Sequence, residues 1–162
     1  MSDPFATLGV EPAFDLDDAQ LHQQFLRGVA RAHPDRHLDP VDQALAAEAT
    51  SHLNQAYRVL SDPELRAKAL LNLWDSAGEG KDVALPPNLL MEMMEVRETM
   101  EQAIAAHDDA ALNRLRQWAS EARAEHLRQI ADAFQTRDVA RVRLELHGLR
   151  YIERMLEQMP LA

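Results

Sequence analysis

The residues of this chain best suited to chemistry or recognition form the tripeptide His33-Pro34-Asp35, flanked by Arg31 and Arg36. Proline lacks an N–H and disfavours helical backbone in the residue before it, so the chain must turn here. The turn separates two helix-length amphipathic segments and presents an imidazole and a carboxylate at a stiff corner. Such a carboxylate suits a charge-assisted hydrogen bond with an arginine of another protein.

A metal site and an enzyme active site are the two other interpretations of this turn. His33, Asp35 and His37 are residue types that bind zinc or iron, but Pro34 stiffens the loop and Arg36 adds repulsive charge. No fourth ligand follows at nearby spacing. An enzyme would also need a glycine-rich phosphate loop or a nucleophile with a matched base, and the sequence offers neither. We therefore expect no catalysis and no cofactor.

Composition restricts the partners and the compartment. The 162 residues carry a net charge of −10, which argues against nucleic acid or an anionic membrane as the main ligand and favours a partner with a basic surface. The chain has no cysteine, which excludes disulfides and thiolate metal sites of its own. Residues 1–5 show no basic leader and no apolar signal core. No stretch of the sequence approaches the roughly 20 apolar residues that a membrane-spanning helix needs. We expect a soluble cytoplasmic protein.

A local reversal of charge precedes the turn. Residues 19–34 contain Arg27 and Arg31 and no acidic residue, inside a chain that is otherwise acidic. Two arginines on a helix are compatible with an ordinary solvated face, and equally with a docking surface for an acidic patch of a partner.

Apolar residues recur at the helical spacing of 3.6 from end to end, which predicts an all-α fold. Helices are expected after Asp17, ending at His33, after Asp39-Pro40 and after Asp62-Pro63, because these residues are typical helix starts. The first two should pack antiparallel across the short turn. The expected inward stripe of the second helix consists of Val41, Leu45, Ala49, Leu53, Ala56 and Leu60.

Glycines and prolines gather at residues 75–88, which indicates a domain boundary. We predict an N-terminal domain at residues 1–75, a linker at 76–87 and a C-terminal three-helix domain at 88–162. The three helices are expected at residues 88–106, 108–135 and 138–158. Their candidate caps are Asp108 and Thr136.

The helix expected from residue 88 has two apolar faces. At about 100° per residue, one face gathers a core stripe of Leu89, Met93, Val96, Met100 and Ala103. Leu90, Met91 and Met94 point to the other side, beside Glu95 and Glu98. A helix in a small bundle cannot bury both faces, so the second is predicted to be a protein contact. Cover by the N-terminal domain of the same molecule is the alternative.

The last helix shows a similar division. Its predicted inward stripe is Val142, Leu146, Leu149, Ile152 and Leu156, which leaves Leu144, Tyr151 and Met155 on the outer side. Residues 85–109 hold six acidic side chains and one basic one, Arg97, and such a surface would attract a basic partner.

The N-terminal part resembles a J domain in three elements that occur in the family's order. These are the opening Phe5-Ala6-Thr7-Leu8-Gly9-Val10, the His33-Pro34-Asp35 signature, and the segment from Asn54 to Ala67 that ends one helix and begins the next. After Ala67 the chain departs from common J domains, because it continues as an apolar helix and enters another helical domain. With the stretch of residues 89–98, this layout resembles the HscB family of J-type co-chaperones.

The resemblance implies a function. HscB-type proteins stimulate the ATPase of a DnaK/HscA-type chaperone and deliver to it the IscU-type scaffold on which iron–sulfur clusters are assembled. The chaperone-binding residues so implied are Arg27, Arg31, His33, Pro34, Asp35 and Arg36. The scaffold-binding residues are Leu90, Met91, Met94, Glu95, Glu98 and Tyr151, whereas Gln102 stands where an acidic residue is expected. A J protein that presents a different client is the alternative function.

Overall fold

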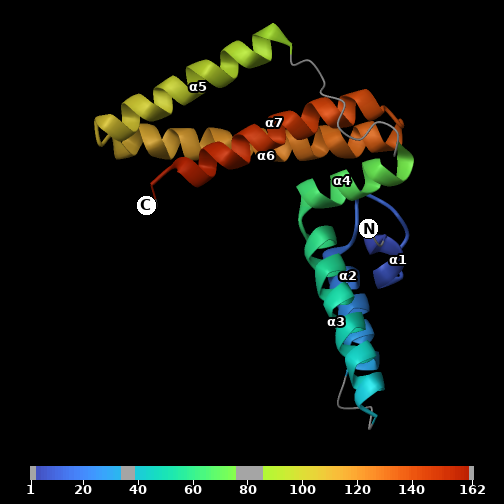
Figure 1. Ribbon diagram of the computed structural model, residues 1–162. Helices are drawn as coiled ribbons and strands as arrows, with labels where there is room; N and C mark the ends of the chain where they lie inside the picture. The colour runs from blue at the N-terminus through green and yellow to red at the C-terminus, as the bar shows by residue number, and fades with distance from the viewer. Residues whose placement is uncertain (1–2, 34–38, 76–85, 161–162) are drawn as a thin grey trace. The chain divides into compact units, whose positions relative to one another are not determined.

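The computed structural model describes residues 3–33, 39–75 and 86–160. The chain separates into two compact units, residues 1–79 and 80–162. The described residues form seven helices and no strand, which confirms the all-α prediction (Figure 1). The helices are α1 (Pro4–Leu8), α2 (Asp18–Arg31), α3 (Pro40–Ser61), α4 (Pro63–Trp74), α5 (Pro87–Ala105), α6 (Asp109–Gln135) and α7 (Val139–Gln158).

Aspartate side chains start most of these helices by accepting a backbone N–H of the first turn, a group that has no partner within the helix. The capping residues are Asp3, Asp17, Asp39, Asp62, Asp108 and Asp138. The two predicted caps, Asp108 and Thr136, lie at the two ends of α6. Thr136 ends α6, and the left-handed backbone of Arg137 (φ 55°) turns the chain before Asp138 begins α7.

In the first unit, α2 and α3 form the predicted antiparallel hairpin (Figure 1). The side chain of Leu53 packs directly on Gly28, where a Cβ atom would lie 2.9 Å from Leu53 Cδ2. Thr50 Oγ1 donates to the carbonyl of Ala32 at 3.2 Å and fixes the end of α2 on α3. Helix α2 ends at Arg31 and not at His33 as predicted, because Pro34 disfavours helical backbone in the residue before it.

The predicted inward stripe of α3 is wrong in its first half. Val41 and Leu45 are 67% and 59% exposed, and Ala49 is exposed as well. Residues four apart advance by slightly more than one helical turn, about 40° per step, so a stripe built from such steps winds around the helix. The side of α3 that faces α2 here carries Ala46 and Thr50.

Arg66 is the one buried charged residue among the described residues. Its Nε donates to the carbonyl of Leu60 at 2.6 Å, near the end of α3, and its Nη1 donates to the carbonyl of Phe14 at 3.0 Å. Its Nη2 lies 3.4 Å from an oxygen of the exposed Asp18. One guanidinium thus joins α3, α4 and the segment before α2, and it supplies donors to carbonyls that are otherwise without helical partners.

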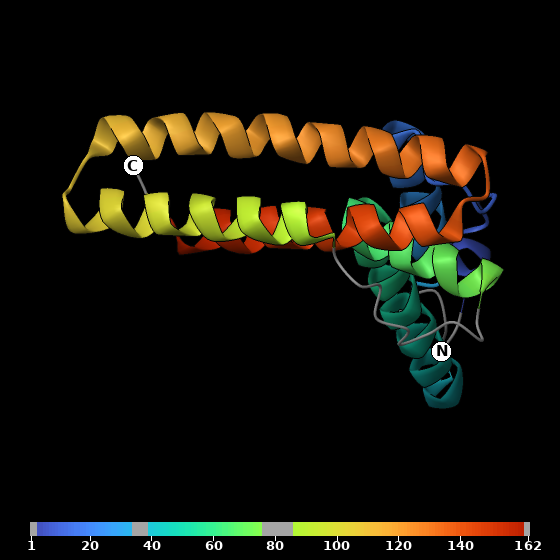
Figure 2. The same cartoon turned by 90° about the horizontal axis from the view of Figure 1, so that it is seen from above.

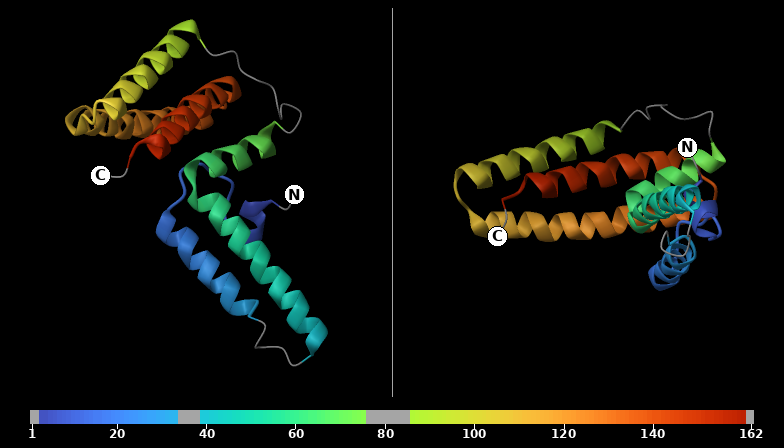
Figure 3. Two further views of the ribbon diagram at one scale, coloured as in Figure 1. Left: turned by 60° about the vertical axis from the view of Figure 1, so that its left-hand side comes forward. Right: turned by 60° about the horizontal axis from the view of Figure 1, so that its bottom comes forward.

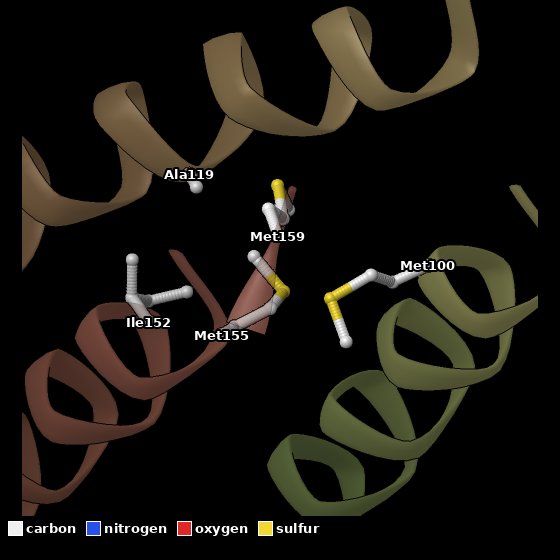
Figure 4. Close-up of a cluster of buried hydrophobic side chains, with 5 residues drawn as sticks. All are labelled: Met100, Ala119, Ile152, Met155 and Met159. Carbon is white, nitrogen blue, oxygen red and sulfur yellow. The ribbon is translucent and has the colours of Figure 1, made fainter. Parts of the chain in front are cut away.

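In the second unit, α6 and α7 run side by side as an antiparallel pair, and α5 contacts α6 and splays away from the pair towards its own N-terminal end (Figures 2 and 3). Gly148 of α7 lies against the ring of His126 of α6, where a Cβ atom would collide with it. The core cluster contains Met100, Ala119, Ile152, Met155 and Met159, contributed by all three helices and the segment after α7 (Figure 4).

The burial of Met155 corrects the prediction that it faces outward. It is 3% exposed, and its sulfur lies beside that of Met100 (Figure 4). Near its C-terminal end α7 has two neighbours, α6 and the C-terminal half of α5, so a wider arc of its surface is buried there. Leu156 and Leu144, assigned to opposite sides, are both half-buried.

We expect Arg66→Met to lower the free energy of unfolding by about 2 to 3 kcal/mol, because the Leu60 carbonyl loses its donor and the Phe14 carbonyl keeps only the N–H of Leu16. Thermal or urea unfolding followed by circular dichroism measures this change. Arg58→Met is the matched control, since Arg58 is exposed on α3. Equal stability of the two variants would show that the guanidinium of Arg66 does not hold the first unit together.

Candidate functional site

The first candidate surface is an exposed side of α2. Arg27 and Arg31 are both exposed there, one helical turn apart, whereas Leu21 and Gly28 are buried. Within the described residues neither guanidinium forms an ion pair. The positive charge of this side of α2 is therefore available to an acidic partner surface.

The turn that follows α2 is only partly described. His33 is exposed at its start. Pro34, Asp35 and Arg36 lie outside the described residues, as does His37. The hydrogen bond from Thr50 to Ala32 fixes the point at which the chain enters the turn, so Arg27 and Arg31 approach the turn on a helix that α3 holds in place.

The second candidate surface is the side of α5 turned away from the core, which we call the outer face of α5. It carries Leu90, Met91 and Met94, which are 44%, 63% and 72% exposed, together with the exposed Glu95 and Glu98. The opposite side holds Met100 and Ala103, both nearly inaccessible, and the half-buried Leu89, Met93 and Val96. The two faces predicted from the sequence are confirmed.

The geometry of the unit explains why no other helix of the unit covers the outer face. The C-terminal end of α5 lies next to α6, and the N-terminal end of α5 diverges from the α6–α7 pair (Figure 1). The core cluster accordingly includes Met100, with Val96 and Ile104 packed against it. A shallow open hollow lies on the outer face, lined by Met91, Met94, Glu95, Arg97, Glu98 and Glu101. The core of the unit is complete without these side chains.

Tyr151 occupies a different position from the other predicted scaffold-binding residues. It is half-buried on α7, its ring packs against the core cluster, and its hydroxyl donates to the carbonyl of Met93 on α5. Burial raises the pKa of Tyr151, and the nearby Arg97 guanidinium lowers it by a smaller amount. Tyr151 therefore lies on the core side of α5, and its hydrogen bond connects the diverging part of that helix to α7.

Two charged residues of the outer face were not among the predicted site residues. Arg97 Nε lies 2.9 Å from a carboxylate oxygen of Glu101, and this hydrogen bond raises the pKa of Arg97. Gln102 donates to Glu98 at 3.2 Å. The spacing of four residues between Arg97 and Glu101 is the signal that could have revealed the pair.

Other kinds of site find no support in the described part of the chain. No group of three or more His, Asp or Glu side chains there could hold a metal ion. The suggested ligands Asp35 and His37 fall outside the described residues. None of the described helices has the length and apolar character needed to cross a membrane.

Comparison with known protein families assigns both units. Residues 3–69 match the DnaJ domain, and residues 85–159 match the family described as the HSCB C-terminal oligomerisation domain. A co-chaperone protein HscB homolog of Neisseria meningitidis serogroup B is 37% identical over 118 residues, which are 71% of each chain. The homolog of Bordetella avium is 30% identical over 164 residues, covering 97% of this chain and 95% of the relative.

Solved structures agree with this assignment. The chaperone HscB from Vibrio cholerae matches with a TM-score of 0.81 and 28% identity, over 97% of this chain and 94% of that one. The human co-chaperone protein HscB matches in fold with a TM-score of 0.85 and 21% identity, over 98% and 80% of the two chains. With a J domain followed by the helical domain characteristic of HscB, this chain belongs to the HscB family of J-domain co-chaperones.

Proposed function

We propose that this protein binds an IscU-type scaffold through the outer face of α5, delivers it to a DnaK/HscA-type chaperone and stimulates that chaperone's ATPase in iron–sulfur cluster assembly. The observation that carries the proposal is the surplus of apolar side chains on α5. Leu90, Met91 and Met94 stay exposed while the same helix buries Met100 and Ala103. Membership in the HscB family supports the choice of the two partners.

The outer face has the make-up of a small binding surface. Burying a large apolar side chain against a partner contributes about 1.5 to 3 kcal/mol when burial is complete. Glu95, Glu98 and Glu101 surround the apolar residues and favour approach of a basic scaffold surface, an effect on the rate of association more than on affinity. Tyr151 supports the face from α7 and holds its N-terminal part in place.

The J domain supplies the second contact. Arg27 and Arg31 would dock on an acidic patch of the chaperone ATPase domain, and the turn with His33, Pro34, Asp35 and Arg36 would follow into the same contact. A hydrogen bond between Asp35 and a chaperone arginine, formed only in the docked ATP state, would shift the chaperone towards the state that hydrolyses ATP. His33 would orient the turn and would not transfer a proton.

We expect Asp35→Asn to abolish stimulation of the chaperone, because the amide removes the charge at the turn. The increase in the ATP hydrolysis rate above its basal value should fall by at least about tenfold. Scaffold affinity should be unchanged. Single-turnover ATP hydrolysis and scaffold titration measure the two effects. Glu48→Gln, which neutralises an exposed carboxylate on α3, is the control and should stimulate normally. Full stimulation by Asp35→Asn would disprove the role of the turn.

The arginine pair gives a separate expectation. Arg27→Ala with Arg31→Ala should raise the chaperone concentration that gives half-maximal stimulation by about three- to tenfold at low salt, since exposed charges each contribute modestly. The difference from the unmodified protein should shrink as salt is added. Arg58→Ala removes an exposed positive charge from α3 and serves as the control. An equal effect of Arg58→Ala would indicate that net charge alone matters.

We expect Met91→Ala with Met94→Ala to weaken scaffold binding by about tenfold or more, and to change the free energy of unfolding by less than about 0.5 kcal/mol. Calorimetric titration with purified scaffold and thermal unfolding measure the two quantities. Met100→Ala is the matched control. It empties a core position and should destabilise the protein by about 2 to 5 kcal/mol.

A large stability loss in the Met91 and Met94 variant would place these side chains inside the fold and overturn the assignment. Normal ATPase stimulation by a protein that does not bind the scaffold would point to a J protein with a different client.

A further inference from the structure

The methionines that the structure describes differ widely in exposure, and Met93 is half-buried, between the two extremes. Met91 and Met94 are 63% and 72% exposed on the outer face of α5. Met100, Met155 and Met159 are 3%, 3% and 6% exposed, and they form much of the core cluster in Figure 4. Because the chain contains no cysteine, methionine thioethers are its only side-chain sulfur and its most readily oxidised groups.

We propose that Met91 and Met94 are a reversible oxidation site that switches scaffold binding off while the J domain stays competent. This inference rests on the proposed function of the outer face. The oxidant is a peroxide. The thioether sulfur attacks the distal peroxide oxygen, an S–O bond forms as the O–O bond breaks, and water or an alcohol leaves. The sulfur is oxidised to the sulfoxide by two electrons, and the peroxide is reduced by two.

The position of the two sulfurs decides what their oxidation does. A sulfoxide is strongly polar, so a side chain that packed against an apolar partner surface would carry an S–O dipole into a contact without donors. In the free protein that dipole remains in water, because neither side chain belongs to the core. Oxidation at these positions therefore weakens the partner contact without a matching loss of fold stability. Met100 and Met155, by contrast, could not carry an S–O dipole in their cluster without opening it.

Two features of the outer face strengthen the effect. Met91 and Met94 are three residues apart on one helix, so both sulfurs lie on the same contact and a single partner meets both changes. Leu90 is the only other large apolar side chain exposed on the described part of α5. Oxidation of the pair thus removes most of the apolar character of the face, whereas the arginines of α2 are chemically unaffected by peroxide.

The test treats the full-length protein with limiting hydrogen peroxide and follows each methionine by peptide mass mapping. Met91 and Met94 should each gain one oxygen atom well before Met100, Met155 and Met159. At that stage scaffold affinity should fall by about tenfold or more, with the thermal midpoint and the scaffold-independent ATPase stimulation unchanged. Methionine sulfoxide reductases supplied with a dithiol, which provides the two electrons while the oxygen leaves as water, should restore binding.

Variants identify the responsible sulfurs, each compared with its own untreated sample. Met91→Leu with Met94→Leu should lose none of its starting affinity on treatment, whereas Met159→Leu should lose affinity as the unmodified protein does. Equal oxidation of buried and exposed methionines, or an equal loss of binding in the double leucine variant, would overturn the switch. Undiminished binding after oxidation would also overturn it and would leave the proposed function intact. Failure of the untreated protein to bind scaffold would instead overturn the proposed function itself.

Discussion

The second unit depends on one geometric constraint: a helix in a three-helix unit buries one side only. Helix α5 has apolar side chains on both sides, and the structure places Met100 and Ala103 inward and leaves Met91 and Met94 in solvent. No rearrangement within three helices could bury both sets. Apolar side chains exposed to water cost free energy. The face that we propose as the scaffold contact is thus a consequence of the pattern on a single helix.

The first unit adds a different constraint to its apolar core, because polar contacts fix the ends of its helices. Aspartate caps fix where α2, α3 and α4 begin, and the buried Arg66 joins the end of α3 to the segment before α2. These contacts fix α2 against α3, and Thr50 holds the last turn of α2. Polar contacts therefore hold the end of α2 just before the turn that we propose as the chaperone contact.

Local signals in the sequence predicted well where helices begin. They predicted less well which side of each helix is buried. The caps Asp17, Asp39 and Asp62 act within three residues, so sequence alone reveals them. Burial depends on where neighbouring helices lie. Leu45 faces solvent because its stripe winds around α3, and Met155 is buried because α5 joins α6 beside it. The role of Arg66 was equally hidden, since its partner Phe14 lies 52 residues away.

The length of a stripe explains why the outer face of α5 was predicted correctly and the inward stripe of α3 was not. The apolar residues of the outer face, from Leu90 to Met94, span less than two turns, so the winding of the stripe stays small. The core stripe opposite is apolar enough to fix the orientation of the helix. The choice of methionine for that face carries a physical trade-off. An unbranched thioether adapts to an uneven partner better than leucine does. The same polarisable sulfur, when exposed, is open to oxidation, so adaptability and sensitivity to peroxide arise from one atom.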